Sequence, residues 1–339
     1  MVFFVILILF LLVLVFRALA VKGRPLEETR HHTTHAQAAD YAGQLSQMIR
    51  CVTVSSKHSY DDTEFAKLRS VMEQLFPLVH THCERMVFGE DCWVYKLPGR
   101  DASRNIMLMS HHDVVKAEGD WKYPPFSGTV AEGKIWGRGV VDTKTPLFAE
   151  FAALEELLAA GYQPRCNVYI ASSHNEETAG SGIPLANEYF KDQDITFELI
   201  LDEGGGIIDP PIGGMACGKC AMTAIHEKGR HKVKLSASQA MSHTNLSATK
   251  TLSPTERMAM FIADVSRKPG FIRRLNPLVK GMLEAMAPYA SFPMKLVFAN
   301  LWCFGPLLTV LLPKLSAQAG GLIGPTVSFR NLSSPDGNT

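Results

Sequence analysis

The sequence lacks an excess of charge of either sign, and it has little cysteine. Its 339 residues include 34 basic and 33 acidic side chains, which gives a formal net charge of +1. Because there is no basic excess to neutralise phosphates, we expect no nucleic-acid partner. The seven cysteines are few and odd in number, so they do not indicate a disulfide framework. The sequence also has no internal repeat of fixed period.

The remaining composition is that of a globular protein. Apolar residues make up 46% of the chain and charged residues 20%, which excludes wholesale disorder. The length predicts about two domains, with enough chain to bury a sizeable core.

An uninterrupted apolar run opens the chain, since residues 2–16 are fifteen apolar residues followed by Arg17. As a membrane helix the run reaches about 20 residues if Arg17 extends its charge to the interface. The nearest charges all follow the run, so the positive-inside rule places the body of the protein on the cytoplasmic side. As an export signal the run would be cleaved after Ala20, although no basic residue precedes it. We predict an anchor or signal in residues 1–22 and a polar linker in residues 23–36.

After the linker, the hydrophobic pattern alternates between helical and strand-like periods. Helical patterns are present at residues 37–50, 61–76, 146–160 and 183–191. Strand-like runs are present at residues 92–97, 105–109, 167–172 and 198–201. Alternation of this kind predicts an α/β layer fold, in which helices flank a largely parallel or mixed sheet.

The pattern changes near residue 229, where we place a boundary between domains at 37–229 and 230–339. The second domain begins with a predicted strand at residues 232–237 and continues with a helix at residues 254–266.

A long apolar stretch at residues 296–312 is nearly long enough to span a membrane. Asn300, Gly305 and Pro306 interrupt it. It fits a buried helix pair or a dimer interface. The alternative is an apolar surface that admits lipid acyl chains or touches a bilayer.

Four segments of the first domain each end a strand or a turn with side chains that can bind a metal. They are residues 110–113 (SHHD), 137–142 (GRGVVD), 174–177 (HNEE) and 201–205 (LDEGG). Functional sites in open α/β sheets gather at the carboxyl ends of strands, so these segments can converge. Their carboxylates would repel one another strongly in one pocket unless cations neutralised them. Imidazole and carboxylates without thiolates suit zinc or a similar divalent ion.

The spacing within these segments suggests separate roles. Residues two apart in an extended segment share a face, so His111 and Asp113 point the same way. Asp113 can then orient a metal-binding His111. On an irregular turn the adjacent Glu176 and Glu177 can diverge, one binding a metal while the other faces a water as general base. Each pair alone is typical of surface charge, but four such segments together indicate a site.

These residues resemble the co-catalytic zinc exopeptidase family, which includes carboxypeptidase S, the aminoacylases and succinyl-diaminopimelate desuccinylase. Within it the sequence most resembles carboxypeptidase S and its N-acyl amino acid hydrolase relatives. The resemblance runs from about residue 37 to the end and is most specific between residues 107 and 207. The segments that carry it are MLMSHHDVV (107–115), WKYPPFSGTVAEGKIWGRGVVDTK (121–144), SSHNEETAGSGI (172–183), LDEGGGI (201–207) and HEKGRHKVKLSA (226–237). It implies a zinc-exopeptidase-like catalytic domain with an inserted α+β lid or dimerisation domain, here incomplete.

The resemblance also implies a role for each matched residue. His111 would bind one zinc ion, with Asp202 as a second ligand of that ion. Asp113 would be the supporting acid of His111. Asp142 would bridge two zinc ions, and Glu177 would bind the other one. Cobalt or manganese could take the place of zinc.

The implied reaction is hydrolysis of an amide bond by metal-activated water, with Glu176 as the general base. His243 matches a lid histidine that reaches the oxyanion, often from a partner subunit, although a surface-loop histidine fits it equally well. The implied substrates are peptides, cleaved at the C-terminal residue, or N-acyl amino acids. A homodimer through the lid is also implied.

The sequence departs from the family pattern in three places. The family's last zinc ligand is a histidine that follows the lid, and no histidine follows His243 here. We therefore expect a chain truncated at Thr339, with one zinc ion short of a ligand. Asn175 stands where the family commonly has an acid, and Thr145 where it has glycine, but neither change removes a ligand.

The favoured hypothesis is a zinc-dependent metallo-carboxypeptidase or aminoacylase-type hydrolase that is membrane-associated or exported. The alternative is an inactive, membrane-tethered remnant that binds one metal ion through His111, Asp142 and Asp202. A zinc-to-protein ratio near two in a purified extended chain favours the enzyme, and a ratio near one or below favours the remnant.

Overall fold

The computed structural model describes residues 1–23, 34–58, 60–209, 219–225, 228–238, 252–268, 270–315 and 317–333. The chain divides into two compact units. We refer to Glu28–Gly205 as the sheet unit, and to Met1–Glu27 together with Gly206–Thr339 as the helical unit.

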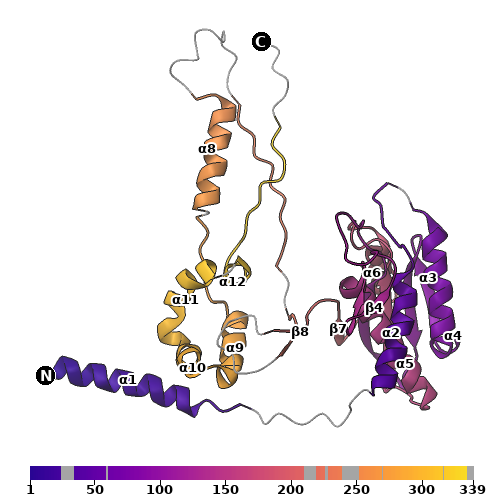
Figure 1. Ribbon diagram of the computed structural model, residues 1–339, viewed down its shortest axis with the longest axis horizontal. Coiled ribbons are helices and arrows are strands. Elements are labelled where there is room, and N and C mark those ends of the chain that lie inside the picture. The colour runs from indigo at the N-terminus through magenta and orange to yellow at the C-terminus, as the bar shows by residue number, and fades with distance from the viewer. Residues whose placement is uncertain are drawn as a thin grey trace, which may run out of the picture. The chain divides into compact units, whose positions relative to one another are not determined.

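The sheet unit is built on a five-stranded sheet in the order β1-β2-β6-β3-β7 (Figure 1). Strand β2 is antiparallel to β1 and β6, whereas β3 is parallel to both β6 and β7. The α/β fold with a mixed sheet is therefore confirmed. The strands are β1 (Glu84–Phe88), β2 (Cys92–Leu97), β3 (Asp101–His111), β6 (Cys166–Ser173) and β7 (Leu199–Leu201), and a separate hairpin contains β4 (Thr129–Ala131) and β5 (Lys134–Trp136).

Helices cover both faces of this sheet. They are α2 (His35–Ile49), α3 (Asp62–Leu75), α4 (Pro77–His82), α5 (Thr145–Ala159) and α6 (Gly182–Asp192), and a π-helical turn, η1 (Val140–Lys144), precedes α5. Local sequence explains where two of them begin. The Thr34 side chain accepts a hydrogen bond from the Gln37 amide at the start of α2, and Asp61 accepts one from the Thr63 amide at the start of α3.

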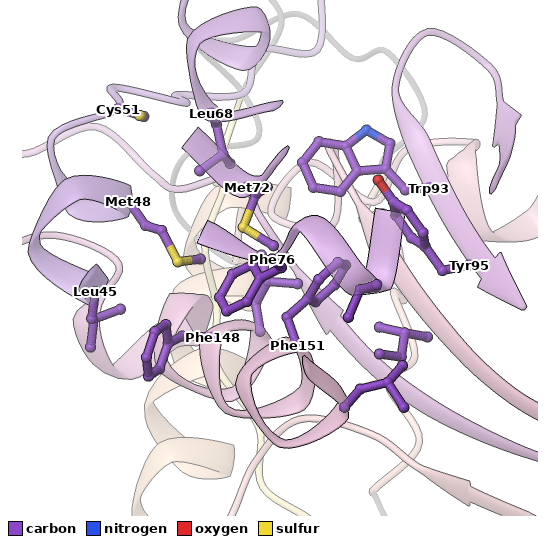
Figure 2. Packing of buried hydrophobic residues seen from close by; sticks show 14 of the residues in the cluster. Leu45, Met48, Cys51, Leu68, Met72, Phe76, Trp93, Tyr95, Phe148 and Phe151 are labelled. Atoms are coloured by element: carbon purple, nitrogen blue, oxygen red, sulfur yellow. The ribbon is translucent and has the colours of Figure 1, made fainter. Parts of the chain in front are cut away.

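Alternation along β2 divides the buried side chains between two layers. Trp93 and Tyr95 lie in a cluster with residues of α2, α3, α4 and α5, including Phe151 (Figure 2). Val94 faces the other way and packs in a second cluster with Phe190 of α6. Apolar residues on both faces therefore fix the sheet between its helices.

The helical unit has little sheet among its described residues. Its elements are α1 (Val2–Ala20), β8 (Gly206–Ile208), β9 (Cys220–Met222), α8 (Pro254–Arg267), α9 (Pro277–Met286), η2 (Ala287–Tyr289), α10 (Phe292–Phe298), α11 (Leu301–Leu315) and α12 (Ala317–Leu322). A buried apolar cluster joins α9, α10, α11 and the segment after α12, with Leu283, Phe298, Leu308 and Ile323 among its members.

The strand predicted at residues 232–237 is wrong. The described segment 228–238 has no regular secondary structure, and its side chains are exposed. Val233 and Leu235 are 76% and 49% exposed. The alternating pattern needs a partner strand and a layer to cover its apolar face, and the described residues provide neither.

Candidate metal centre

Three parallel strands, β6, β3 and β7, end at the same edge of the sheet. In this register His111 lies opposite Ser173, and Leu108 lies opposite Leu201. The turn after β6 and the segment after β7 therefore begin beside the end of β3. Segments far apart in the sequence converge there, as expected for the carboxyl ends of parallel strands.

Side chains alternate at the end of β3. His111 and Asp113 face the same side, with His111 Nδ1 3.2 Å from Asp113 Oδ1, and both residues are fully buried. His112 faces the other side, where its ring stacks on Trp93 with 4.0 Å between centroids. Its Nδ1 lies 2.9 Å from Ser172 Oγ. The predicted shared face of His111 and Asp113 is therefore present.

Asp113 holds the turn that carries the two adjacent glutamates. The backbone N–H of Glu176 donates to Asp113 Oδ1, and that of Glu177 donates to Oδ2, each over 3.1 Å. Burial alone would raise the pKa of Asp113, but hydrogen bonds from His111 and Ser55, together with the charge of His111, hold the pKa below its usual value. Asp113 is thus an ionised, buried acceptor that fixes both His111 and the glutamate turn.

The segment with Asp142 is attached to the same strand end. Gly139 begins it with φ +84°, and a Cβ there would lie 2.7 Å from Val114 Cγ1, so glycine is required. Thr143 Oγ1 then accepts a hydrogen bond from the His111 amide and donates one to the His111 carbonyl, over 3.0 and 2.9 Å. This pairing places Asp142 beside the His111 ring.

Three side chains meet at the second nitrogen of His111. The Nε2 atom lies 2.9 Å from Asp142 Oδ1 and 3.1 Å from Glu203 Oε2. One ligand atom from each of the three residues lies within 4.8 Å of the other two. Glu176 Oε2 is 4.0 Å from the same nitrogen. One imidazole therefore faces three carboxylates at the sheet edge.

The charges of this group favour a cation. Burial would lower the pKa of His111, but the carboxylates of Asp113 and Glu203 raise it to about 11. Glu203 Oε2 is buried and has no well-directed hydrogen-bond partner among the described residues. An imidazole nitrogen surrounded by carboxylates, one of which has no well-directed hydrogen bond, is a donor set that a divalent metal ion satisfies. The residues present therefore fit a metal ion.

The two glutamates on the turn have raised pKa values. Burial is the largest cause for both. The neighbouring carboxylate of Glu203 adds to it for Glu176, and that of Asp142 adds to it for Glu177. Neither glutamate carboxylate belongs to the group of His111, Asp142 and Glu203, but Glu176 Oε2 lies 4.0 Å from His111 Nε2.

Glu203 is a residue that sequence reasoning missed. The prediction named Asp202, but in the structure the Asp202 carboxylate accepts a hydrogen bond from the Glu203 amide over 2.8 Å. The Glu203 carboxylate is the one that lies beside His111. Asp202 and Glu203 are adjacent acids after β7, and strand alternation does not determine which of them faces the site beyond the last strand residue. The predicted catalytic residue His243 lies outside the described residues.

Comparison with known proteins gives a match over the site and beyond it. The model of Peptidase family M20/M25/M40 matches residues 107–280, slightly more than half of the chain. "Probable carboxypeptidase S-like 2" of Dictyostelium discoideum is 31% identical over 256 residues, which cover 74% of this chain and 49% of the relative. "N-fatty-acyl-amino acid synthase/hydrolase PM20D1" of Homo sapiens is 31% identical over 265 residues, which cover 77% and 52%. This chain spans about half the length of these curated relatives.

Solved structures also match. Human carnosine dipeptidase 1 aligns with a TM-score of 0.43 and 16% identity, covering 51% of this chain and 41% of that one. The M20 family metallo-carboxypeptidase Sso-CP2 from Sulfolobus solfataricus aligns with a TM-score of 0.42 and 21% identity, covering 50% and 38%.

Proposed function

Since the chain belongs to peptidase family M20/M25/M40, we propose that it is a zinc-dependent hydrolase of amide bonds. The proposed substrates are peptides, cleaved at the C-terminal residue, and N-acyl amino acids. The names of the carboxypeptidase S-like relative and of the N-fatty-acyl-amino acid hydrolase support this choice. Membership of this peptidase family confirms the family resemblance that was inferred from the sequence.

The observation that carries the proposal is the group of His111, Asp142 and Glu203 beside the glutamate turn. We assign the first zinc ion to these three residues, with Glu203 in place of Asp202. Asp142 and Glu177 would contribute to a second ion. Zinc, when bound, lowers the pKa of water and polarises a carbonyl oxygen.

Glu176 is assigned as the general base. Its carboxylate lies 4.0 Å from His111 Nε2, close to the proposed metal position without belonging to the three-residue group. Burial raises its pKa, and a carboxyl whose pKa moves toward neutrality can both accept and release a proton. Glu176 would take a proton from water and pass it to the leaving amine. Asp113 would keep the turn in place through its two backbone hydrogen bonds.

Helix α1 is proposed as a membrane anchor. It has 19 residues, a mean hydropathy of 3.2 over its most apolar window and only 11% of that window buried. At about 1.5 Å per residue it approaches the roughly 30 Å of a bilayer core. Arg17 near its end contacts the Ala299 carbonyl, and Leu14 is buried within the helical unit. These contacts support a retained helix over a cleaved signal, and the basic residues after it favour a cytoplasmic body.

The test compares the wild-type chain with Glu176→Gln, using a short peptide and N-acyl amino acids of different chain length. Wild-type turnover should require zinc, and Glu176→Gln should lower kcat by about 10²- to 10⁴-fold. Metal analysis should give the same zinc content for both proteins. Glu188→Gln, on the exposed surface of α6, should leave kcat and zinc content unchanged. A wild-type chain that binds one zinc ion or none, without turnover, would contradict the hydrolase and favour the metal-binding remnant.

A further inference from the structure

Helix α11 is apolar on all sides. One face, with Leu301, Leu308 and Leu312, is buried in the cluster of the helical unit. The rest of the helix surface is also largely apolar, and it is exposed: Trp302, Leu307, Val310, Leu311 and Leu315 are between 39% and 72% exposed. A helix that is hydrophobic all round is typical of a protein core or of a membrane. Because one face of α11 already packs on the core, the exposed face needs another apolar environment.

The bend between α10 and α11 has its polar groups satisfied inside the protein. The chain bends by 105° between the two helices, which together are apolar enough for a broken membrane span or a re-entrant loop. Asn300 at the bend is fully buried, and its side-chain Nδ2 donates to the Leu14 and Leu296 backbone carbonyls over 3.0 and 2.8 Å. Arg17 reaches the Ala299 carbonyl at the end of α10. Non-helical backbone at membrane depth requires this kind of internal partnering.

The same bend packs along α1. Asn300 and Arg17 join α10 to the second half of α1, and the Trp302 ring meets the Phe10 ring edge-on at 5.9 Å. Figure 1 shows α10 beside the end of α1 that leads into the rest of the chain. Phe10 lies ten residues before Ala20, or about 15 Å along the helix. If α1 crosses a core roughly 30 Å thick, the start of α11 lies near its middle.

The charge of these segments suits an anionic lipid surface. Residues 270–333 contain six basic side chains and one acid, a balance of +5, and residues 1–23 contain Arg17 and Lys22 without any acid. Within α10–α12 the only charged side chains are Lys295 and Lys314. Lys314 lies near the end of α11, where a long basic side chain can reach the headgroups.

We propose that α10 and α11 form a re-entrant hairpin that inserts into the lipid bilayer beside α1. Its outward face, with Trp302, Leu307, Val310, Leu311 and Leu315, contacts the acyl chains. The inference rests on the membrane anchoring proposed for α1 and adds a second, non-spanning contact with the same bilayer. Lipid acyl chains therefore provide the apolar environment that the exposed face of α11 requires.

The test uses quenching of tryptophan fluorescence by brominated lipid chains. The full chain is reconstituted into phosphatidylcholine–phosphatidylserine vesicles, with and without mid-chain bromine, and purified by flotation. Of the four tryptophans only Trp302 belongs to the helical unit, since Trp93, Trp121 and Trp136 lie in the sheet unit. Bromine should quench part of the wild-type emission, and Trp302→Phe should remove most of that quenched part.

A second pair of variants tests the face itself. Leu311→Glu should reduce the quenching of Trp302 several-fold, because a charge in hydrocarbon disfavours insertion. Leu185→Glu is the matched control, since Leu185 on α6 is 38% exposed and Leu311 is 39% exposed. It should leave the quenching unchanged.

The results that would contradict the proposed hairpin can be told apart from those that would contradict the α1 anchor. Equal quenching in wild-type protein and Trp302→Phe, in vesicles that float with the protein, overturns the hairpin but leaves the α1 anchor intact. Absence of flotation overturns both. Unquenched Trp302 together with a dimer in light scattering assigns the face to a second copy of the chain. None of these results bears on hydrolysis, because no turnover is measured.

Discussion

The metal centre and the α1–α10–α11 segments break the usual rule of burial in opposite ways. At the metal centre, charged side chains are buried, and Asp113 and His111 lie at the end of a central strand with almost no exposure. In the helical unit apolar side chains are exposed, including most of α1 and the outer face of α11. Soluble proteins bury few charges, and they rarely expose large contiguous apolar patches.

The difference shows what each region needs in order to be stable. Buried charges at the metal centre are stable only where many polar or charged groups lie close to them. The convergence of three strand ends brings these groups together. The exposed apolar faces depend on an environment outside the chain. Departures from this burial rule are expected at functional sites. The metal centre carries the proposed hydrolase activity, and the α1–α10–α11 segments carry the proposed membrane contact.

The largest effect is expected where the buried charge has the most partners. Asp113→Asn keeps the shape but removes the charge, and its amide group would face the N–H of Glu176 or Glu177. Leaving buried partners unpaired should lower the free energy of unfolding by about 3 kcal/mol. Loss of orientation at His111 should weaken zinc binding by about 10- to 100-fold. Thermal unfolding and zinc titration measure the two effects.

The matched control for this change is Asp101→Asn. Asp101 also accepts a backbone N–H, from Ser103 over 3.0 Å, but it is exposed. Its replacement should leave zinc affinity and the Tm nearly unchanged. If both variants behaved alike, burial would not be what makes Asp113 important, and the contrast between the two regions would lose its basis.

Most of the sheet unit could be predicted from hydrophobic periodicity. The strand predicted at residues 92–97 is β2, and the helix predicted at residues 183–191 lies within α6 (Gly182–Asp192). Each of these segments packs one apolar face on a neighbouring layer. The spacing of apolar residues in the sequence therefore follows the burial of side chains in the fold. β3 runs from Asp101 to His111, longer than predicted, because its polar first residues are held by pairing of Asp101 with Cys166.

The site was predictable as a set of segments but not in every residue. Glycine turns and strand ends identified the segments with Asp142, Glu176 and Asp202. The choice of Glu203 depends on the backbone path after β7, where Gly204 and Gly205 have φ values of +102° and +78°. No periodic pattern describes such a turn.

The apolar stretch at residues 296–312 shows a different limit. Its composition indicated a buried or membrane-contacting segment, but the bend at Ala299 and Asn300 follows from the contact with α1, almost 300 residues earlier in the chain. Such distant partners are not visible in a local pattern.

An intermediate effect is expected from a second buried acid in the sheet unit. Glu150 on α5 accepts a hydrogen bond from Ser110 Oγ over 2.9 Å, and burial raises its pKa to about 8. The folded state therefore binds this proton more tightly than the unfolded chain does, so stability should fall as pH rises from about 5 to 8. The full shift corresponds to about 3.5 kcal/mol over that window. Because Glu150 is partly exposed, solvent screens the shift, and we expect a loss on the order of 2 kcal/mol. Glu150→Gln should remove this part of the pH dependence.

Thermal unfolding between pH 5 and 8 checks the prediction, and the exposed Glu188→Gln serves as control. Glu150→Gln should be more stable than wild-type protein at pH 8 and similar to it at pH 5. Parallel pH profiles for all three proteins would show that Glu150 is ionised in the fold. The sheet unit would then contain one more buried charge than we infer.

The smallest effect is expected at Asn300, the buried polar side chain at the bend between α10 and α11. Asn300→Leu keeps the volume but removes the hydrogen bonds to the Leu14 and Leu296 carbonyls. Both carbonyls already lie in helices, so the loss should be about 1 kcal/mol, well below that at Asp113. That free energy corresponds to about fivefold faster amide exchange in the second half of α1, measured by mass spectrometry in vesicles.

Thr309→Val makes the same kind of polar-to-apolar change on the same hairpin, but Thr309 Oγ1 donates to Pro306 within α11. It should leave exchange in α1 unchanged, because it does not touch that helix. Equal acceleration by both variants would mean that Asn300 does not hold α1. If Asn300→Leu cost as much as Asp113→Asn, the helical unit would depend on buried polar groups as strongly as the metal centre does. The exposed apolar faces would then no longer be what distinguishes it.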